Sequence, residues 1–323
     1  MGKVRADIIT IFGEEIHPGE SKELNFSIAK LHTNTPVDVP IIIERSKYKG
    51  PTVLFTAGIH GDEVNGIEII RQLISKGINR PKTGTIICIP IINIFGFIQN
   101  AREFPDGRDL NRSFPGNKSG SLAGRVAFKL MNEIIPHIDY CLDFHSGGSN
   151  RFNAPQIRIE KNDSLLLKLA TVFNPPFVLK STNLKKTFRN SCKKKGVPLL
   201  LFEGGKSNYI DSVVSNTGVN GSKRVLHHLG MLRSNFKVSS PKKSPILISQ
   251  SKWLRAHKSG MFKPIIKTGA FVEKGQVIGH ITDPYGKINY RYKSSFSGYI
   301  INVNESPLIY QGDALFHIST VIG

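Results

Sequence analysis

The sequence predicts an α/β protein with a mostly parallel or mixed sheet flanked by helices, followed by a smaller all-β domain at the C-terminus. Short, mostly apolar runs, at residues 52–57, 85–93 and 138–144, alternate with segments of helical periodicity, which is typical of βαβ units. Near the C-terminus, two glycine-punctuated segments repeat one strand-rich pattern. A polar stretch rich in lysine and serine separates the two parts.

The length and composition are those of a globular protein with more than one domain. The chain has 323 residues, of which 39% are hydrophobic and 21% charged. We place the boundary at the polar stretch 234–244, which gives a large domain at 1–238 and a β-sandwich at 239–323. The N-terminus carries no apolar run suited to a signal peptide, and no segment reaches the roughly 18 apolar residues of a membrane span. We therefore expect a cytoplasmic protein without membrane contact.

The charge balance is strongly basic. Lysine and arginine number 44 against 24 acidic residues, a net charge of +20, which suits nucleic acid, an anionic substrate or simply a solvated surface. The densest basic run, Lys180 to Lys195, lacks the interleaved aromatic residues of a base-stacking surface. We interpret this run as a solvated basic face near the entrance of a site, and we do not expect nucleic acid as a partner.

The N-terminal segments are predicted to be strands, because apolar or alternating residues are separated there by glycine, proline and asparagine. These strands are expected at 7–12, 23–32 and 39–44. The uncharged run 52–57 then predicts a strand buried on both faces, and apolar residues recur at helical spacing from Val64. His60 and Glu63 therefore lie on a strand-to-helix loop, where open α/β sheets carry their ligand sites.

His60 and Glu63 are candidate metal ligands. A histidine and a carboxylate three residues apart, in a turn punctuated by Gly58 and Gly61, can converge on one cation because glycine lets the backbone fold tightly. A catalytic zinc takes three protein ligands plus water, so this pair requires a third ligand. The alternative is that His60 only caps the turn through a hydrogen bond.

The connection 93–120 is long, polar and rich in glycine, proline and asparagine, and long loops of this kind are usually functional. It contains Arg102, Arg108, Asn111 and Arg112. Guanidinium groups and an asparagine amide are suited to binding a carboxylate. The alternative is a surface loop in which the arginines form ion pairs with neighbouring acidic residues.

A third candidate ligand follows the next predicted strand. A helix predicted over 121–136 precedes the strand 138–144, which delivers His145 ahead of two glycines. His145 thus occupies a strand-end loop of the same kind as the loop of His60. Asp143, two residues earlier, is placed to orient a ligand through a hydrogen bond.

The same pattern of strand, polar residue and glycine appears once more. After a helix predicted over 164–172, the apolar run 197–202 ends in Glu203 before two glycines. A carboxylate that emerges from an apolar strand is partly desolvated, which raises its proton affinity toward the range useful for acid/base catalysis. The alternative, in which Glu203 caps the following segment, does not explain why three strands deliver polar residues in the same way.

The C-terminal part contains two variants of one unit, each with an apolar strand that ends in His-Ile. Such paired hairpins are similar to the small β-sandwich of biotinyl and lipoyl carriers, but the lysine-bearing triplet of those carriers is absent. We therefore interpret the two histidines, His280 and His317, as structural.

Together these motifs resemble those of the succinylglutamate desuccinylase/aspartoacylase family, within the wider zinc metallocarboxypeptidase superfamily. The matching motifs are GIHGDE, PDGRDLNRSFPG, DFHSGG and FEGG, in the order of the family, and a β-rich C-terminal domain follows as it does there. The resemblance covers essentially the whole chain and implies a zinc carboxypeptidase-like fold for the large domain. It also implies one Zn²⁺ per chain, with His60, Glu63 and His145 as its ligands.

The resemblance further implies roles for the remaining candidates. Glu203 corresponds to the general base, and Asn111 and Arg112 correspond to the clamp for the substrate carboxylate. Arg102 corresponds to the residue that polarises the scissile carbonyl, although Arg108 is close enough in sequence to take a place in substrate binding.

The chemistry implied is metal-assisted hydrolysis of an amide. Zinc polarises a carbonyl and lowers the pKa of its water to about 7, while Glu203 transfers a proton to the leaving amine. The expected substrate is an N-acyl amino acid, and the net charge of +20 favours an acidic one. The alternatives are a metallocarboxypeptidase or deglutamylase acting on short acidic peptides, and a basic binding protein that retains a zinc fold. A homo-oligomer is compatible with each of these.

Overall fold

A computed structural model describes residues 4–241 and 243–323. Residues 1–3 and Lys242, which falls in the predicted linker 234–244, lie outside the described residues. The strands are β1 (Ile9–Ile11), β2 (Glu14–Ile16), β3 (Ser21–Lys30), β4 (Pro36–Arg45), β5 (Thr52–Ala57), β6 (Thr85–Ile89), β7 (Tyr140–Gly147), β8 (Arg151–Ile159), β9 (Phe177–Lys180), β10 (Leu199–Lys206), β11 (Ile246–Arg255), β12 (Gly260–Pro264), β13 (Phe271–Val272), β14 (Val277–Thr282), β15 (Asn289–Lys293), β16 (Gly298–Asn304), β17 (Leu308–Ile309) and β18 (Ala314–Ile322).

Helices connect the strands of the larger part. The α-helices are α1 (Val64–Ser75), α2 (Ile94–Gln99), α3 (Leu122–Lys129), α4 (Ser164–Phe173), α5 (Phe188–Lys194) and α6 (Ser212–His228), and the shorter turns are η1 (Leu110–Arg112), η2 (Leu130–Ile134) and η3 (Ile135–His137). Among the described residues, no helix is long and apolar enough to cross a membrane.

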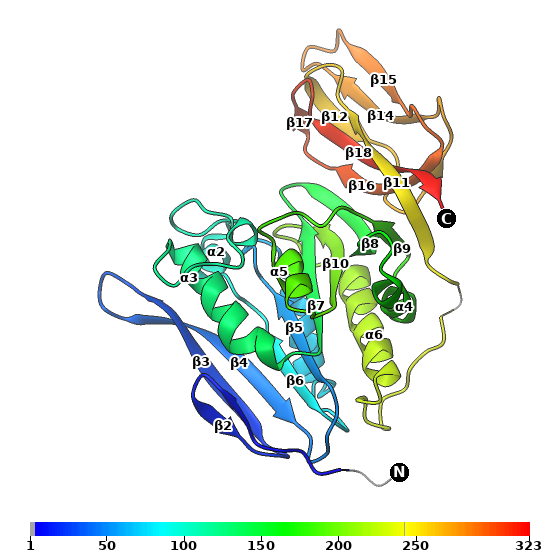
Figure 1. Cartoon of the computed structure of the whole chain (residues 1–323). Coiled ribbons are helices and arrows are strands. Elements are labelled where there is room, and N and C mark those ends of the chain that lie inside the picture. The colour runs from blue at the N-terminus through cyan, green and yellow to red at the C-terminus, as the bar shows by residue number, and fades with distance from the viewer. Residues whose placement is uncertain (1–3, 242) are drawn as a thin grey trace.

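The fold is the predicted α/β architecture with a C-terminal β domain (Figure 1). Within the described residues, the main sheet has the strand order β13-β16-β18-β11-β9-β8-β10-β7-β5-β6-β4-β3, and a second sheet has the order β15-β14-β12-β17. The strands β6, β5, β7 and β10 run parallel to one another. Their carboxyl ends therefore lie at one edge of the sheet, where the loops of an α/β protein bind ligands.

Hydrophobic packing covers both faces of the main sheet. One core lies between the sheet and the segments α3, η2 and α5, and a second core lies between the sheet and α1, α4 and α6. Helix α1 contributes Ile69, Ile70 and Leu73 to this second core. Leu73 follows Ile69 by four residues and Ile70 by three, so the three side chains lie on one side of the helix. A third core fills the C-terminal domain between its two layers of strands.

The C-terminal domain is hydrogen-bonded directly to the larger part. Strand β8 pairs with β9, β9 with β11, β11 with β18, β18 with β16, and β16 again with β8. These pairings close a ring of strands that contains members from both sides of the predicted boundary. The boundary we placed after residue 238 lies in the irregular stretch between α6 and β11, yet the hydrogen bonds of this ring cross it.

Three segments differ from the sequence-based expectation. The connection 93–120 is not structureless, because it contains α2 and η1; Asn93 caps α2 by accepting a hydrogen bond from the Gly96 amide. The basic run 180–195 is not wholly solvated, because it includes α5, whose Phe188 and Cys192 are buried. Helix α6, which the sequence pattern did not predict, is capped by Asp211.

Candidate metal centre

The loop after β5 is held in a tight turn against α2. Gly58 has a φ of +60°, a conformation that favours glycine, and a Cβ atom at Gly61 would collide with the backbone of Gly96 in α2. The glycines of the motif are therefore required by the turn and by its close packing. This geometry brings His60 and Glu63, at the end of β5, toward the end of β7.

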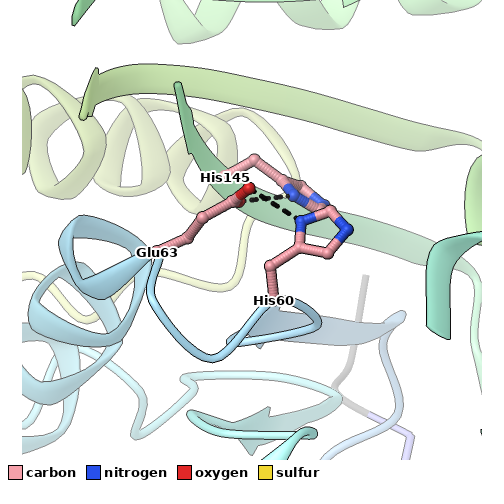
Figure 2. A group of neighbouring side chains, drawn as sticks. All are labelled: His60, Glu63 and His145. Atoms are coloured by element: carbon pink, nitrogen blue, oxygen red, sulfur yellow. Dashed lines mark hydrogen bonds and ion pairs between the residues drawn. The ribbon is translucent and has the colours of Figure 1, made fainter. Parts of the chain in front are cut away.

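The loop and β7 together assemble three buried candidate ligands (Figure 2). The Nδ1 atom of His60 lies 2.7 Å from Oε1 of Glu63, and the Nδ1 atom of His145 lies 2.8 Å from Oε2 of the same carboxylate. The ligand atoms of the three residues all lie within 4.8 Å of one another. The structure thus brings together the three residues that the sequence predicted as metal ligands.

Two further carboxylates orient the imidazole rings. The Nε2 atom of His145 donates to Asp143, at 2.9 Å, as expected from the sequence. The Nε2 atom of His60 donates to Asp109, at 3.1 Å, a contact that the sequence did not predict. In a neutral ring whose proton is on Nε2, facing the outer carboxylate, the Nδ1 atom would present a lone pair to the centre of the group.

The donor set fits a metal ion. In that tautomer two imidazole lone pairs and a carboxylate would face one another in a buried space, and groups that only accept hydrogen bonds are stabilised by a positive charge between them. Imidazole nitrogen and carboxylate oxygen are ordinary zinc ligands, and two histidines with one glutamate form a known catalytic ligand set. The group His60, Glu63 and His145 could therefore hold a metal ion.

The pKa values of Glu63 and His145 also indicate that this group favours a positive charge. Burial by itself would raise the pKa of the Glu63 carboxyl, but the two histidines outweigh burial and hold that pKa well below its ordinary value. Burial by itself would lower the pKa of His145, but Asp143 and Glu63 raise it well above its ordinary value. The site therefore strongly favours a positive charge between the carboxylates.

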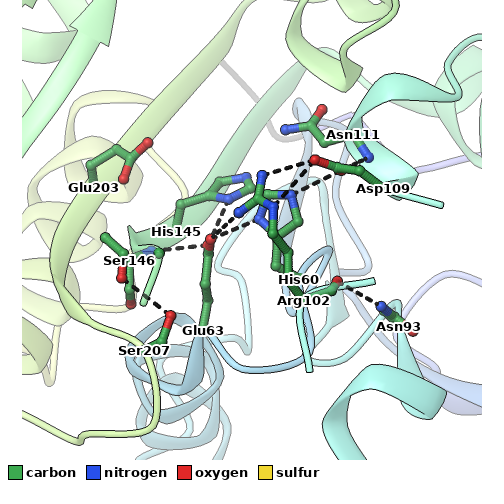
Figure 3. A network of polar contacts seen from close by, with 12 residues as sticks. His60, Glu63, Asn93, Arg102, Asp109, Asn111, His145, Ser146, Glu203 and Ser207 are labelled. Atoms are coloured by element: carbon green, nitrogen blue, oxygen red, sulfur yellow. Dashed lines mark hydrogen bonds and ion pairs between the residues drawn. The ribbon is translucent and has the colours of Figure 1, made fainter. Parts of the chain in front are cut away.

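Arg102 reaches the same centre from the connection after α2 (Figure 3). Its Nη1 atom lies 3.2 Å from Oε1 of Glu63, and its Nη2 atom lies 2.9 Å from Oδ2 of Asp109. The structure therefore places a guanidinium group beside the three candidate ligands, with Asp109 as a bridge between Arg102 and His60.

Glu203 lies on β10, next to the strand that carries His145, and its Cα atom is paired in register with that of His145. Its side chain is 14% exposed. Its Oε2 atom accepts a hydrogen bond of 3.0 Å from Asn153, and its Oε1 atom lies 3.8 Å from a guanidinium nitrogen of Arg158. Figure 3 shows Glu203 separate from the polar network around Glu63.

A cavity of about 290 Å³ joins these groups. Its size is that of a small-molecule site. Asn111 and Arg112 line it, and the Oδ1 atom of Asn111 accepts a hydrogen bond from the backbone of Phe188. Arg108 does not line this cavity; its side chain is 63% exposed and lies 3.4 Å from Asp106.

The cavity is rich in arginine, including residues that sequence reasoning missed. Arg189 donates to the backbone oxygen of Thr182 and to the hydroxyl of Ser181, and burial, followed by the charge of Arg158, lowers its pKa to about 10. The C-terminal domain contributes Trp253 and Asn302 to the wall. The arginines that line the cavity are Arg102, Arg112, Arg151, Arg158 and Arg189, and the acidic residues are Glu63, Asp143 and Glu203.

Comparison with known proteins identifies relatives of the whole chain. Residues 49–229 match the sequence model of the succinylglutamate desuccinylase/aspartoacylase catalytic domain. A curated relative, N-alpha-acetyl-L-2,4-diaminobutyric acid deacetylase from Halomonas elongata, is 26% identical over 302 residues, which cover 88% of this chain and 86% of the relative.

Solved structures share the fold over nearly the full length. The product-bound ectoine utilization protein EutE (DoeB) from Ruegeria pomeroyi superposes with a TM-score of 0.81 at 22% identity, covering 94% of this chain and 95% of that one. A succinylglutamate desuccinylase from Silicibacter sp. TM1040 gives a TM-score of 0.82 at 22% identity, covering 99% of this chain and 100% of that one. At this identity the likeness establishes the α/β fold with its C-terminal β domain.

Proposed function

Because this chain belongs to the succinylglutamate desuccinylase/aspartoacylase family, we propose that it is a zinc-dependent amide hydrolase that releases the acyl group of an N-acyl amino acid with an acidic side chain. The observation that carries this proposal is the convergence of the His60, Glu63 and His145 group with Glu203 on one cavity of about 290 Å³. That constellation supplies a metal site and a separate carboxylate within one small-molecule pocket.

In this proposal the metal is held by His60, Glu63 and His145. When bound, a zinc ion would polarise the scissile carbonyl and lower the pKa of water to about 7. Asp109 and Asp143 hold the imidazole rings in the tautomer that leaves Nδ1 free for the metal.

Glu203 is proposed as the general base. It is the cavity carboxylate that the metal group leaves free. Asn153 donates to its Oε2 atom, and its Oε1 atom makes no hydrogen bond to a described residue. A carboxylate in this position can take a proton from the attacking water and return it to the leaving amine.

The remaining polar residues hold the substrate in this proposal. The planar guanidinium of Arg112 and the amide nitrogen of Asn111, which donates no hydrogen bond to a described residue, are suited to a carboxylate beside the scissile amide. Holding that carboxylate fixes the amide for attack. Arg102 brings a positive charge to where the carbonyl oxygen becomes negative. Arg108 takes no part, because it lies outside the cavity.

Preference for an acidic substrate is supported by Arg158 and Arg189. Arg158 lies 3.8 Å from Glu203, which the proposed reaction needs as a free base, and Arg189 interacts with both Glu160 and Glu203. Five arginines and three acidic residues line the cavity, so a substrate carboxylate would balance part of this positive charge. The relative from Halomonas elongata is named for diaminobutyric acid, which carries a second amine, and five cavity arginines would repel such a group.

A second candidate, a metallocarboxypeptidase or deglutamylase acting on acidic peptides, requires an open cleft. Trp253 and Asn302 of the C-terminal domain form part of the cavity wall, which supports the smaller substrate. The charge of the cavity alone fits either substrate.

The test combines metal content with amine release from N-acetyl and N-succinyl derivatives of aspartate, glutamate, diaminobutyrate and alanine, and from short glutamyl peptides. We expect about one zinc per chain in the wild type and in Glu203→Gln. Of these two proteins, only the wild type should hydrolyse acidic N-acyl amino acids. The variant His145→Ala should lose its zinc. Turnover of peptides alone would favour the second candidate. Full zinc binding and activity in His145→Ala would refute the metal site.

A further inference from the structure

A chain of hydrogen bonds leads from the C-terminal domain to Glu203. The Nδ2 atom of Asn302 on β16 donates to Oδ1 of Asn153 on β8, at 2.8 Å. The Nδ2 atom of Asn153 in turn donates to Oε2 of Glu203 on β10, at 3.0 Å. Three strands from two parts of the molecule are thus joined through side chains at the cavity.

The position of Asn302 follows from the ring of strands described above. Asn302 and Asn153 are Cα partners in the antiparallel pairing of β16 with β8, so their side chains lie on the same face. Asn153 is also the Cα partner of Gly205 on β10, just past an irregularity in the register that follows Glu203. Gly205 has a φ of +71°, a conformation that favours glycine, at this irregularity.

The charge of Glu203 determines the direction of both amides. A carboxylate only accepts hydrogen bonds, so Asn153 must present its NH₂ group to Glu203 and its carbonyl oxygen to Asn302. Asn302 must then present its own NH₂ group to Asn153. The opposite orientation of either amide would set two oxygen atoms against each other in a buried place.

Burial makes these contacts effective. Asn153 is 4% exposed and Asn302 is 2% exposed, so water does not compete for their amides. Arg158, at 3.8 Å, is beyond hydrogen-bond distance from Glu203, so Asn153 is the donor that fixes the carboxylate. The Oδ1 atom of Asn302 has no hydrogen-bond partner in the described part of the chain, so the bond to Asn153 is what holds this amide.

We propose that Asn302 is a positioning residue for the reaction: through Asn153 it aligns the Glu203 carboxylate, so that the C-terminal domain contributes to catalysis as well as to the cavity wall. This inference rests on the proposed role of Glu203 as general base. Asn302 acts on the rate of the chemical step, because it orients the base and holds no part of the metal.

The test compares two leucine substitutions on the same strand in the full-length protein. Asn302→Leu keeps the branching and the number of side-chain heavy atoms and removes the donor to Asn153. Asn304→Leu is the matched control: Asn304 bonds the backbone oxygen of Ala314 and the amide of Ser306, with no link to Glu203. We expect both variants to bind zinc like the wild type, and only Asn302→Leu to lose about 10- to 100-fold in kcat at unchanged KM.

A double substitution tests whether the two asparagines act in series. If they do, Asn153→Ala combined with Asn302→Leu should reduce kcat no further than Asn153→Ala alone. Multiplied losses would show two independent effects and overturn the proposal. A raised KM with unchanged kcat in Asn302→Leu would also overturn it, because that result identifies a substrate contact.

A crystal structure of Asn302→Leu supplies a readout that does not depend on activity. We expect the Asn153 amide and the Glu203 carboxylate to be displaced, with His60, Glu63 and His145 unmoved; an unmoved Glu203 refutes the proposal. If Glu203→Gln retains full activity, the role of Glu203 as base is wrong. If Glu203→Gln is inactive while Asn302→Leu keeps the wild-type kcat, only the inference about Asn302 fails.

Discussion

Gly66 provides a direct test of how helix α1 supports the metal site. A Cβ atom at this position would lie 2.6 Å from the carbonyl oxygen of Phe144 and 2.8 Å from its Cβ atom. Phe144 belongs to β7 and immediately precedes His145, so its backbone cannot move without moving a candidate ligand. The substitution Gly66→Ala should therefore push α1 away from the strand that carries His145.

Two opposing effects determine the stability of this variant. Alanine is favoured over glycine within a helix by about 1 kcal/mol. Forcing an extra methyl group into a packed interior costs about 1–3 kcal/mol, and the contact here is with backbone, which yields less readily than a side chain. We expect a net loss of about 1–2 kcal/mol in the free energy of unfolding, together with weaker metal binding.

Gly124 in α3 is the matched control for this experiment. A Cβ atom there would lie 3.4 Å from the Ser121 hydroxyl, an ordinary contact, so Gly124→Ala should be neutral or stabilising by up to about 1 kcal/mol. Urea unfolding of both variants with a chelator present gives the stability, and zinc titration gives the affinity. If Gly66→Ala were as stable as Gly124→Ala, the close packing of α1 on β7 would be refuted.

Three further outcomes follow from the site. Asp109→Asn should weaken zinc binding about 10- to 100-fold by releasing the ring of His60, whereas Asp106→Asn should not, as measured by competition with a chelator. Arg189→Ala should raise KM for acidic N-acyl amino acids much more than for neutral ones, and an equal rise for both would contradict its role. Burial, followed by the charge of Arg158, lowers the pKa of His317 to about 3, so the unfolded chain binds a proton at this residue more readily than the folded chain. The stability that the neutral ring contributes should be complete above about pH 6.5 and lost as the pH falls toward 3. The variant His317→Gln should therefore show a smaller fall in urea midpoint than the wild type between about pH 7 and pH 5.

The sequence predicted those parts of the site that are determined by neighbouring residues in the chain. The run 52–57 matches β5 because an uncharged apolar segment of that length can be buried on both faces of a sheet. His60, Glu63 and His145 could be recognised because glycines mark the turns that follow strands, and parallel strands end at one edge. Asp143 was predicted for the same reason, since alternation along β7 keeps it on the side of His145.

The parts that the sequence did not predict depend on contacts between distant segments. Asp109 reaches His60 only because α2 and η1 fold the connection back over the loop. Helix α2 has six residues and includes a glycine, so its periodicity is too short to detect. Arg189 was hidden in a basic run, where nothing local separates a buried arginine from solvated lysines.

Strand β8 carries residues that line the cavity and also pairs with a strand of the C-terminal domain. It carries Asn153, which contacts the proposed base, and Arg158, which lines the cavity, and its first residues pair with β16. The metal ligands come instead from the ends of β5 and β7, which make no strand pairing with the C-terminal domain among the described residues. If Glu203 acts as proposed, changes in the C-terminal domain should alter the alignment of its carboxylate and leave the group His60, Glu63 and His145 in place. The composition shift at 234–244 marks a change in sequence character, but residues from both sides of it line the cavity.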